Sequence, residues 1–484
     1  MCSKLLREMK KAFLRLLCCC LALVLTTSQA DTLAITGGTL IDGTGAAPIK
    51  NGTLLIEGER IKAIGPASKV AIPAGSRIID AKGKFIIPGL IDANLHLFLN
   101  IDAETLIKYE DRYDEIILEA AQLALKSGQT TVFDTWGPRD SLIKTRDRIN
   151  AGEAVGSRIF LAGNIIGFDG PISADFLAAM VPNLSQATVQ RINKQWQDKV
   201  GRELMWQTPD TVREAVRDYA ASPIDFLKYG GSGHTEMQFI QFSPRVQKAI
   251  VEEGHRAGKT VQVHTTSVES LDMAIDAGVD ILTHCDISGP VVAIPPETIR
   301  KMVEQNIACS ILPITQARLD ALLEKEATRD FAQYMKIGRQ NEQALVEAGV
   351  TLLLSTDSGV AHPILTAEKA SQNVLFDSRT NIVEGLFNAL TGLEELGMDP
   401  MDILQTTTSN IARAYNHQDD FGTLQPGLYA DVVILDKNPL KGARNYRSIH
   451  QVIKQGSVID RDSLPTAPLI SNQKVPEAES TGTM

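Results

Sequence analysis

The sequence contains few cysteines, and most of them lie near one end. Only 6 of the 484 residues are cysteine. Four lie in the N-terminal segment: Cys2, Cys18, Cys19 and Cys20. The other two, Cys285 and Cys309, are too few for a disulfide-rich scaffold, whatever the redox compartment. They could form one bridge, although we expect two unpaired thiols.

The chain also lacks an excess of positive charge and a long apolar run. With 48 Lys and Arg against 58 Asp and Glu, its formal net charge is −10. An acidic surface argues against nucleic acid and against anionic membranes as partners. The apolar run of residues 16–25 is too short to span a bilayer as a stable helix.

Residues 1–30 are typical of a secretion signal. A basic segment precedes the apolar run, and Ser28 and Ala30 offer small residues to a signal peptidase. No small residue stands just before Cys18, which argues against a lipoprotein anchor. Cleavage after Ala30 would remove five basic residues and one acidic residue, taking the formal charge to −14. We therefore predict an exported protein, periplasmic or secreted, without a membrane partner after cleavage.

Short strand-like runs broken by glycine flank a long middle segment, and their composition is typical of β-hairpins. The runs span residues 33–42, 53–65, 430–436 and 449–459. We predict one small β-sandwich built from both ends of the chain, residues 31–86 and 419–460. The remaining residues, 461–484, are rich in Pro, Ser, Thr and Glu and are predicted to be disordered.

The middle segment, residues 87–418, alternates short apolar runs with amphipathic stretches, a pattern that indicates repeated βα units. The eight candidate strands span residues 85–97, 130–134, 158–162, 224–229, 260–264, 280–284, 307–312 and 351–357. Eight such units predict an α/β fold with a (β/α)₈ TIM-type barrel. Its chemistry would lie at the C-terminal ends of the strands.

Polar side chains stand where several of these apolar runs end. Asp92, Asn94 and His96 recur at a two-residue interval, which places them on one face of a strand. The strand-end residues are Asn94, His96, Lys228, His264, His284 and Asp357. A single histidine at a strand end is usually a hydrogen-bonded core residue. Three imidazoles and a carboxylate gathered on one rim instead favour a zinc-type metal site.

The motifs around these residues resemble those of the amidohydrolase superfamily, specifically its secreted imidazolonepropionase-like and Xaa-Pro dipeptidase-like branch. They span residues 88–92 (PGLID), 128–132 (GQTTV), 225–228 (DFLK) with Gly230-Gly231, 263–264, 283–284, 355–359 (STDSG) and 422–433. The resemblance implies a metallohydrolase barrel, usually binuclear, in which Lys228 carries CO₂ as a bridging carbamate. It also implies a small-molecule or dipeptide-like substrate.

One residue departs from the family pattern. The first strand of the family usually ends His-x-His, whereas this chain has Asn94-Leu-His96. An amide oxygen is a weaker zinc ligand than imidazole, so that position should bind its metal less tightly, use a harder ion or stand empty. We therefore expect Zn²⁺ as one or two ions, one firm and one weak. The alternative is a non-catalytic barrel that binds a ligand through a degenerate site.

The expected activity is hydrolysis of an amide, peptide or cyclic amide bond by a metal-activated water. Asp357 would be both a metal ligand and the general base and acid. Tyr229, His234 and His362 are candidates for binding the substrate. A glycosidase would need paired carboxylates at strand ends, and the sequence places only Asp357 well. The oligomeric state is left open, a homo-oligomer included.

Overall fold

The computed structural model describes residues 32–98, 103–176, 183–197, 199–234, 236–326, 330–359 and 382–464. The predicted signal, most of the predicted C-terminal tail and His362 lie outside these ranges. Within the described ranges, no helix is both long and apolar enough to cross a membrane.

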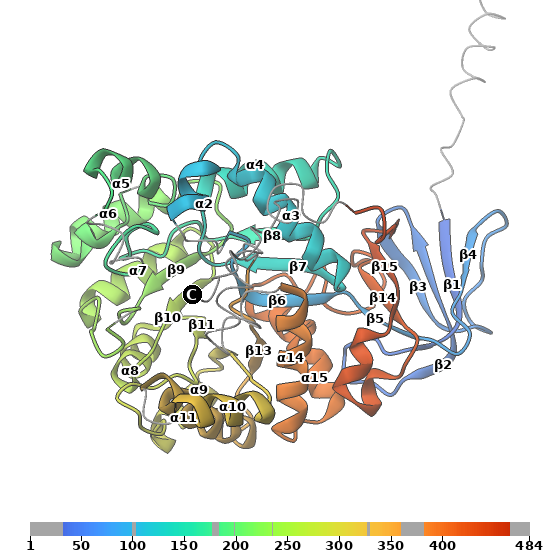
Figure 1. The fold of residues 1–484 in the computed structure, drawn as a ribbon. Helices are drawn as coiled ribbons and strands as arrows, with labels where there is room; N and C mark the ends of the chain where they lie inside the picture. Colours follow the sequence, from blue (N-terminus) through green and yellow to red (C-terminus); the bar gives the residue numbers. More distant parts are fainter. Residues whose placement is uncertain are drawn as a thin grey trace, which may run out of the picture.

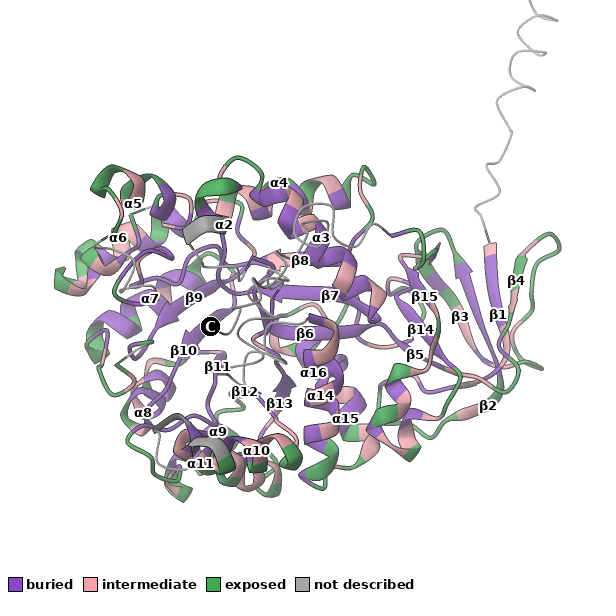
Figure 2. Ribbon diagram, in the orientation of Figure 1, coloured by how far each residue is buried: buried purple, intermediate pink, exposed green. Residues whose placement is uncertain are grey.

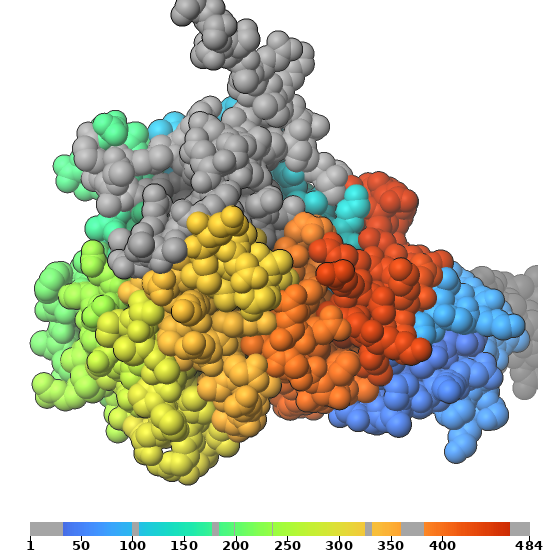
Figure 3. Space-filling model, turned by 60° about the horizontal axis from the view of Figure 1, so that its bottom comes forward, coloured from blue at the N-terminus to red at the C-terminus, as the bar shows by residue number. Residues whose placement is uncertain are grey.

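Both ends of the chain contribute to one mixed sheet, at the right of Figure 1, in the order β16-β15-β14-β5-β1-β2-β3 with β4 paired to β1. Antiparallel pairing of β14 with β5 sets Val432 opposite Pro88 and joins the two ends. The N-terminal and C-terminal colours also meet in Figure 3. Both ends of the chain therefore build one β-unit as predicted, but its strands form a single mixed sheet where a β-sandwich was predicted. Its strands are β1 (Thr32–Leu40), β2 (Ile49–Glu57), β3 (Arg60–Pro66), β4 (Arg77–Asp80), β5 (Phe85–Pro88), β14 (Val432–Leu435), β15 (Ile449–Lys454) and β16 (Ser457–Ile459).

The middle of the chain forms two parallel sheets, β6-β7-β8 and β13-β12-β11-β10-β9. Every strand predicted for this segment is present. The strands are β6 (Leu90–Leu95), β7 (Gln129–Asp134), β8 (Arg158–Leu161), β9 (Leu227–Gly230), β10 (Val261–His264), β11 (Ile281–Thr283), β12 (Ala308–Ile311) and β13 (Leu352–Leu354). All their residues are buried except Phe160, which is partly exposed. This burial explains why the strands are nearly continuous apolar runs.

Backbone hydrogen bonds connect the two parallel sheets on both sides. The amide of Asp357, just after β13, donates to the carbonyl of Asn94 in β6 (2.9 Å). On the other side, the amide of Ile166, after β8, donates to the carbonyl of Lys228 in β9 (2.8 Å). Residues far apart in sequence are thereby brought to the same ends of neighbouring strands.

The helices lie outside the strands and turn their apolar sides inward, so that buried residues line the centre in Figure 2 and exposed residues its rim. In α6, Val212 and Val216 are buried, and the N-cap Thr208 accepts a hydrogen bond from the Thr211 amide. The helices are α2 (Ala103–Lys108), α3 (Tyr113–Lys126), α4 (Arg139–Asn150), α5 (Gln186–Asn193), α6 (Pro209–Ala220), α7 (Pro244–Arg256), α8 (Val268–Ala277), α9 (Pro296–Glu304), α10 (Gln316–Glu326), α11 (Asp330–Glu347), α14 (Ile382–Glu395), α15 (Pro400–Thr406) and α16 (Ser409–Ala414).

The first predicted strand, residues 85–97, is divided between two sheets. β5 belongs to the mixed sheet and β6 to the parallel strands, with Gly89 between them. A Cβ atom at Gly89 would lie 2.1 Å from the Thr130 hydroxyl, so only glycine allows this close approach. The apolar run is therefore the point where the chain passes from one sheet to the other.

The expectation of two unpaired thiols is wrong. Cys285 and Cys309 form a disulfide, with Cα atoms 6.1 Å apart. Pairing of β11 with β12 sets Leu282 opposite Cys309 and so brings the cysteine that follows β11 within reach. Both cysteines are fully buried.

Reduction of this disulfide is expected to lower the free energy of unfolding by about 2–4 kcal/mol, because the bond closes a loop of 24 residues in the unfolded chain. Denaturant unfolding with and without dithiothreitol measures the effect. The Cys285→Ala/Cys309→Ala variant is the control, since the reductant should leave its unfolding unchanged. Equal stability of the oxidised and reduced wild-type protein would contradict the prediction.

Candidate functional site

Asn94 and His96 meet Asp357 where β6 and β13 end. His96 Nε2 lies 2.9 Å from Asp357 Oδ1, and Asn94 Nδ2 donates to the same oxygen at 3.3 Å. His96 Nδ1 lies 3.2 Å from the Trp136 carbonyl oxygen. Because a carbonyl can only accept, Nδ1 donates to it, and Nε2 is the ring nitrogen that faces Asp357.

Lys228 of β9 is 1% exposed, and its amine points toward Asn94. Its Nζ donates to Asn94 Oδ1 (3.2 Å) and to the Thr135 hydroxyl (3.0 Å). Thr135 also hydrogen-bonds Asn94 Oδ1. Burial lowers the pKa of Lys228 to about 8, against the opposing effect of the Asp357 and Asp134 charges. A neutral amine, the form that can react with CO₂, is therefore more accessible here than in water.

His264 of β10 and His284, just after β11, lie side by side with ring centroids 5.2 Å apart. Both are nearly fully buried. Burial, reinforced by the charge of His284, holds the pKa of His264 well below its usual value, so its imidazole is neutral. Its Nε2 is buried and has no hydrogen-bond partner among the described residues. Such an orphaned ring nitrogen suits a metal ligand better than a core residue.

Two of these residues have an unusual backbone conformation. His284 has φ of 59° and Asp357 has φ of 51°, a region that costs a residue other than glycine about 1–2 kcal/mol. The amide of His284 donates to the Ser310 carbonyl (3.0 Å), which helps to hold it there. His284 directly follows β11, and Asp357 lies three residues after the end of β13, so a left-handed turn beyond a strand sets the direction of each side chain.

Comparison with known proteins identifies the fold and its family. A model of the amidohydrolase family matches residues 85–459. This chain belongs to the amidohydrolase family. The crystal structure of phenylurea hydrolase B and the structure of molinate hydrolase each superpose with a TM-score of 0.86 at 34% identity. They cover 92% and 94% of this chain and 100% and 99% of their own chains. Ochratoxinase of Aspergillus niger is 25% identical over 442 residues, 88% of this chain and 85% of that protein.

Amidohydrolases usually bind a divalent metal ion, so the fit of the residues present must be tested. Among the described residues, no three His, Cys, Asp or Glu side chains form a group that could hold a metal. The orphaned Nε2 of His264 and the presented Nε2 of His96 do suit one. The residues of this amidohydrolase therefore fit a metal ion if Asn94 or Lys228 completes the ligand set.

Two buried carboxylates organise the loops around this site. Asp92 accepts from the Thr356 hydroxyl (2.6 Å) and from the backbone amide of Asn94 (3.1 Å). Asp134 accepts from the backbone amides of Leu97 (2.7 Å) and Trp136 (3.2 Å). Burial raises the pKa of each aspartate to about 7, against the lowering effect of these hydrogen bonds. Both carboxylates hold backbone turns in place.

The three predicted substrate-binding residues differ in their surroundings. Tyr229 is fully buried, and its hydroxyl donates to Gln247 of α7 (3.0 Å), on the other side of β9 from the Lys228 amine. His234 is exposed, and its ring lies 5.8 Å from that of His264 and 4.8 Å from that of Phe176. His362 lies outside the described residues.

Sequence reasoning missed Thr135, Trp136 and Ser355. Thr135 contacts both Lys228 and Asn94, and the Ser355 hydroxyl accepts from Asn94 Nδ2 (3.1 Å). The only signal available was their position, since Thr135 and Ser355 directly follow β7 and β13 and Trp136 is the second residue after β7.

Proposed function

We propose that this amidohydrolase is a metal-dependent enzyme that cleaves the carbon–nitrogen bond of an amide, urea or dipeptide-like small molecule, with Asp357 as general base and acid. The observation that carries the proposal is the convergence of Asn94, His96 and Lys228 with Asp357 at hydrogen-bonding distance, from strands far apart in sequence. The 34% identity to molinate hydrolase and phenylurea hydrolase B supports it.

We also infer that the eight parallel strands form a closed (β/α)₈ barrel. The hydrogen bonds from Asp357 to Asn94 and from Ile166 to Lys228 support closure on both sides. In such a barrel, catalytic residues stand at the C-terminal strand ends. Asn94, His264 and His284 lie in the last residues of a strand or just after it, which supports this inference.

Lys228, if carboxylated, together with His264 and His284 would hold one ion, and Asn94 with His96 would contribute to a weaker second position. A bound divalent ion, zinc in the first instance, would supply Lewis acidity and a water of pKa near 7. The neutral state of His264 and the lowered pKa of Lys228 support these roles. The side chains of Thr135 and Ser355 hold the Asn94 amide in one orientation.

Asp357 is the residue that transfers a proton in the proposed reaction. Its carboxylate accepts the proton of the attacking water and passes it to the leaving nitrogen as the carbon–nitrogen bond breaks. The contacts with His96 Nε2 and Asn94 Nδ2 hold one carboxylate oxygen in place. The Asp357 side chain is 22% exposed, which leaves it accessible to a substrate.

Aromatic side chains next to the site favour an apolar group on the substrate. Trp136 and Phe176 stack with centroids 4.2 Å apart, and Phe176 contacts His234. Phe168 packs edge-on against His264 at 5.5 Å. Trp136 and Phe168 are buried, so a phenyl or alkyl substituent beside the scissile carbonyl would contact the partly exposed Phe176. The phenyl group of a phenylurea, the substrate named for one of the solved relatives, would do the same.

The test is hydrolysis of a panel of phenylureas, N-acyl amino acids and Xaa-Pro dipeptides by the metal-loaded protein. We expect turnover in at least one class, abolished by chelation and restored by zinc. Firm metal binding with no hydrolysis of any class would favour the alternative, a non-catalytic barrel in which Asn94 marks a degenerate site.

The Asn94→His variant is expected to bind more metal than the wild-type protein, because imidazole is a stronger zinc ligand than an amide oxygen. Metal analysis of zinc-loaded, desalted protein should rise from about one ion per chain toward two. Gln305→His, at an exposed position that follows α9, is the control and should leave the count unchanged. An unchanged count for Asn94→His would mean that residue 94 does not face a metal position.

We further propose that the chain is exported and cleaved after Ala30. The basic residues, the short apolar run and the small residues at Ser28 and Ala30 support this proposal. N-terminal sequencing of protein recovered from a secreting host should begin at Asp31. A mature protein that retains Met1 would contradict it.

A further inference from the structure

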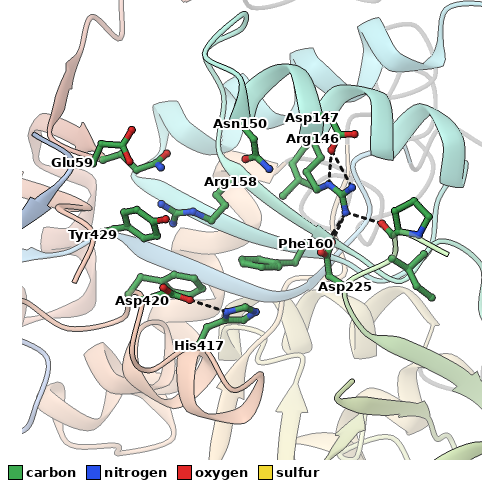
Figure 4. Close-up of a pocket in the computed structure, with 15 residues that line it drawn as sticks. Glu59, Arg146, Asp147, Asn150, Arg158, Phe160, Asp225, His417, Asp420 and Tyr429 are labelled. Atoms are coloured by element: carbon green, nitrogen blue, oxygen red, sulfur yellow. Dashed lines mark hydrogen bonds and ion pairs between the residues drawn. The ribbon is translucent and has the colours of Figure 1, made fainter. Parts of the chain in front are cut away.

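A cavity of about 650 Å³ opens at the opposite end of the strands from the candidate site. Arg158, the first residue of β8, lines it, whereas the candidate catalytic residues follow strand ends. Figure 4 shows side chains from three parts of the chain around this cavity: Glu59 near β3, Arg146 and Asn150 of α4, and Tyr429 near the C-terminus. The cavity is separate from the proposed chemistry, and nothing in the proposed function uses it.

Arg158, which lines this cavity, has an unused hydrogen-bond donor. Its side chain is 8% exposed, and Nη1 donates to Asp431 (2.6 Å) and to the Thr131 hydroxyl (2.8 Å). Its Nη2 is buried and has no hydrogen-bond partner in the described part of the chain. The guanidinium lies over the rings of Tyr429 (4.7 Å) and Phe421 (5.1 Å). A buried, unsatisfied guanidinium nitrogen is costly, and a ligand oxygen would satisfy it.

The other charges of the cavity are mainly negative. Arg146 is occupied by Asp225 (3.1 Å) and Asp147 (3.0 Å). Asp420 lies 3.4 Å from His417, and Glu59 adds an exposed carboxylate. A simple carboxylate ligand would meet this negative field, whereas a ligand that also carries an ammonium group would be attracted by it.

The walls of the cavity are aromatic. Phe160 packs against His417 with centroids 4.3 Å apart and against Phe421 at 5.7 Å. Phe160 and His417 are only partly buried, so their rings offer surface to a ligand. An apolar or aromatic body could stack on this wall while its polar groups reach the charged residues.

We propose that this cavity binds a small zwitterion with an aromatic body, of which an aromatic α-amino acid is the simplest. Its carboxylate would accept from Arg158 Nη2, its ammonium group would face the carboxylates of Glu59 and Asp420, and its ring would lie on Phe160. The ligand satisfies the unused donor and balances the acidic field at the same time.

Isothermal titration of the full chain with L-phenylalanine, 3-phenylpropionate and phenethylamine tests this proposal. We expect L-phenylalanine to bind with one site per chain and at least about tenfold tighter than either probe, because each probe lacks one of the charge-assisted hydrogen bonds. Absence of binding, or equal affinity for 3-phenylpropionate, would overturn it.

Two variants locate the binding. Glu59→Gln removes an exposed carboxylate of the cavity, and Arg158→Lys keeps the charge facing Asp431 but removes Nη2; each should weaken binding about tenfold or more. Glu57→Gln, an exposed glutamate at the end of β2 outside the cavity, is the matched control and should leave affinity unchanged. Binding that is unaffected by Glu59→Gln would place the amino acid elsewhere and overturn the proposal, even if Arg158→Lys fails to fold.

Discussion

Replacement of Asp357 by Asn is expected to lower kcat/KM for any substrate of the panel by about 10²–10⁴-fold, the range that positioned acid–base groups contribute. Asparagine matches the size of aspartate but cannot accept the proton of the attacking water. It also tolerates the left-handed backbone at residue 357, where φ is 51°. The fold should therefore be kept, which thermal unfolding checks.

Asp276→Asn is the matched control for this change. Asp276 lies near the end of α8, close to where β11 begins and not to the strand ends that carry the candidate site. Its side chain is 66% exposed and lies 3.3 Å from Lys301. Its replacement should leave both turnover and metal content unchanged. Full activity of Asp357→Asn would remove Asp357 as the base.

The Lys228→Met variant is expected to lose activity without losing stability. Methionine fills a similar volume without a buried amine, so the free energy of unfolding should rise or stay unchanged. The loss of a ligand at this position should weaken metal binding at least about 10–100-fold and hydrolysis with it. Metal titration followed by denaturant unfolding measures both effects on one preparation. Retained metal affinity would show that Lys228 is not a ligand.

The Lys454→Met variant tests whether removing a buried lysine outside the candidate site raises stability without changing activity. Lys454 of β15 is 8% exposed, and burial lowers its pKa to about 8, as for Lys228, but it lies in the mixed sheet. A charged Lys454 costs stability below about pH 8, and the cost disappears as pH rises toward the pKa of about 10.5 in the unfolded chain. The variant should therefore gain about 1–3 kcal/mol at pH 7, lose that gain above pH 10.5, and keep full activity.

The parallel strands could be predicted from the sequence because each is buried and so forms a short apolar run. The candidate residues could be located for the same reason, since a polar side chain that ends such a run is conspicuous. Alternation along β9 would also have shown that Tyr229 points away from Lys228, because neighbouring residues of a strand face opposite sides.

Other features depend on contacts that no local pattern contains. The division of residues 85–97 between two sheets follows from the approach of Gly89 to Thr130. The disulfide follows from the register of β11 against β12. Thr135 is an ordinary polar residue in the sequence and acquires a role only because Lys228 and Asn94 lie within reach of its hydroxyl.

The most direct test of the central claim is a crystal structure of zinc-loaded protein, with anomalous data collected on both sides of the zinc absorption edge. The account predicts an anomalous peak coordinated by His264 and His284, with density for a carboxylated Lys228 beside it. A structure grown with zinc that shows no peak at these histidines would contradict the account.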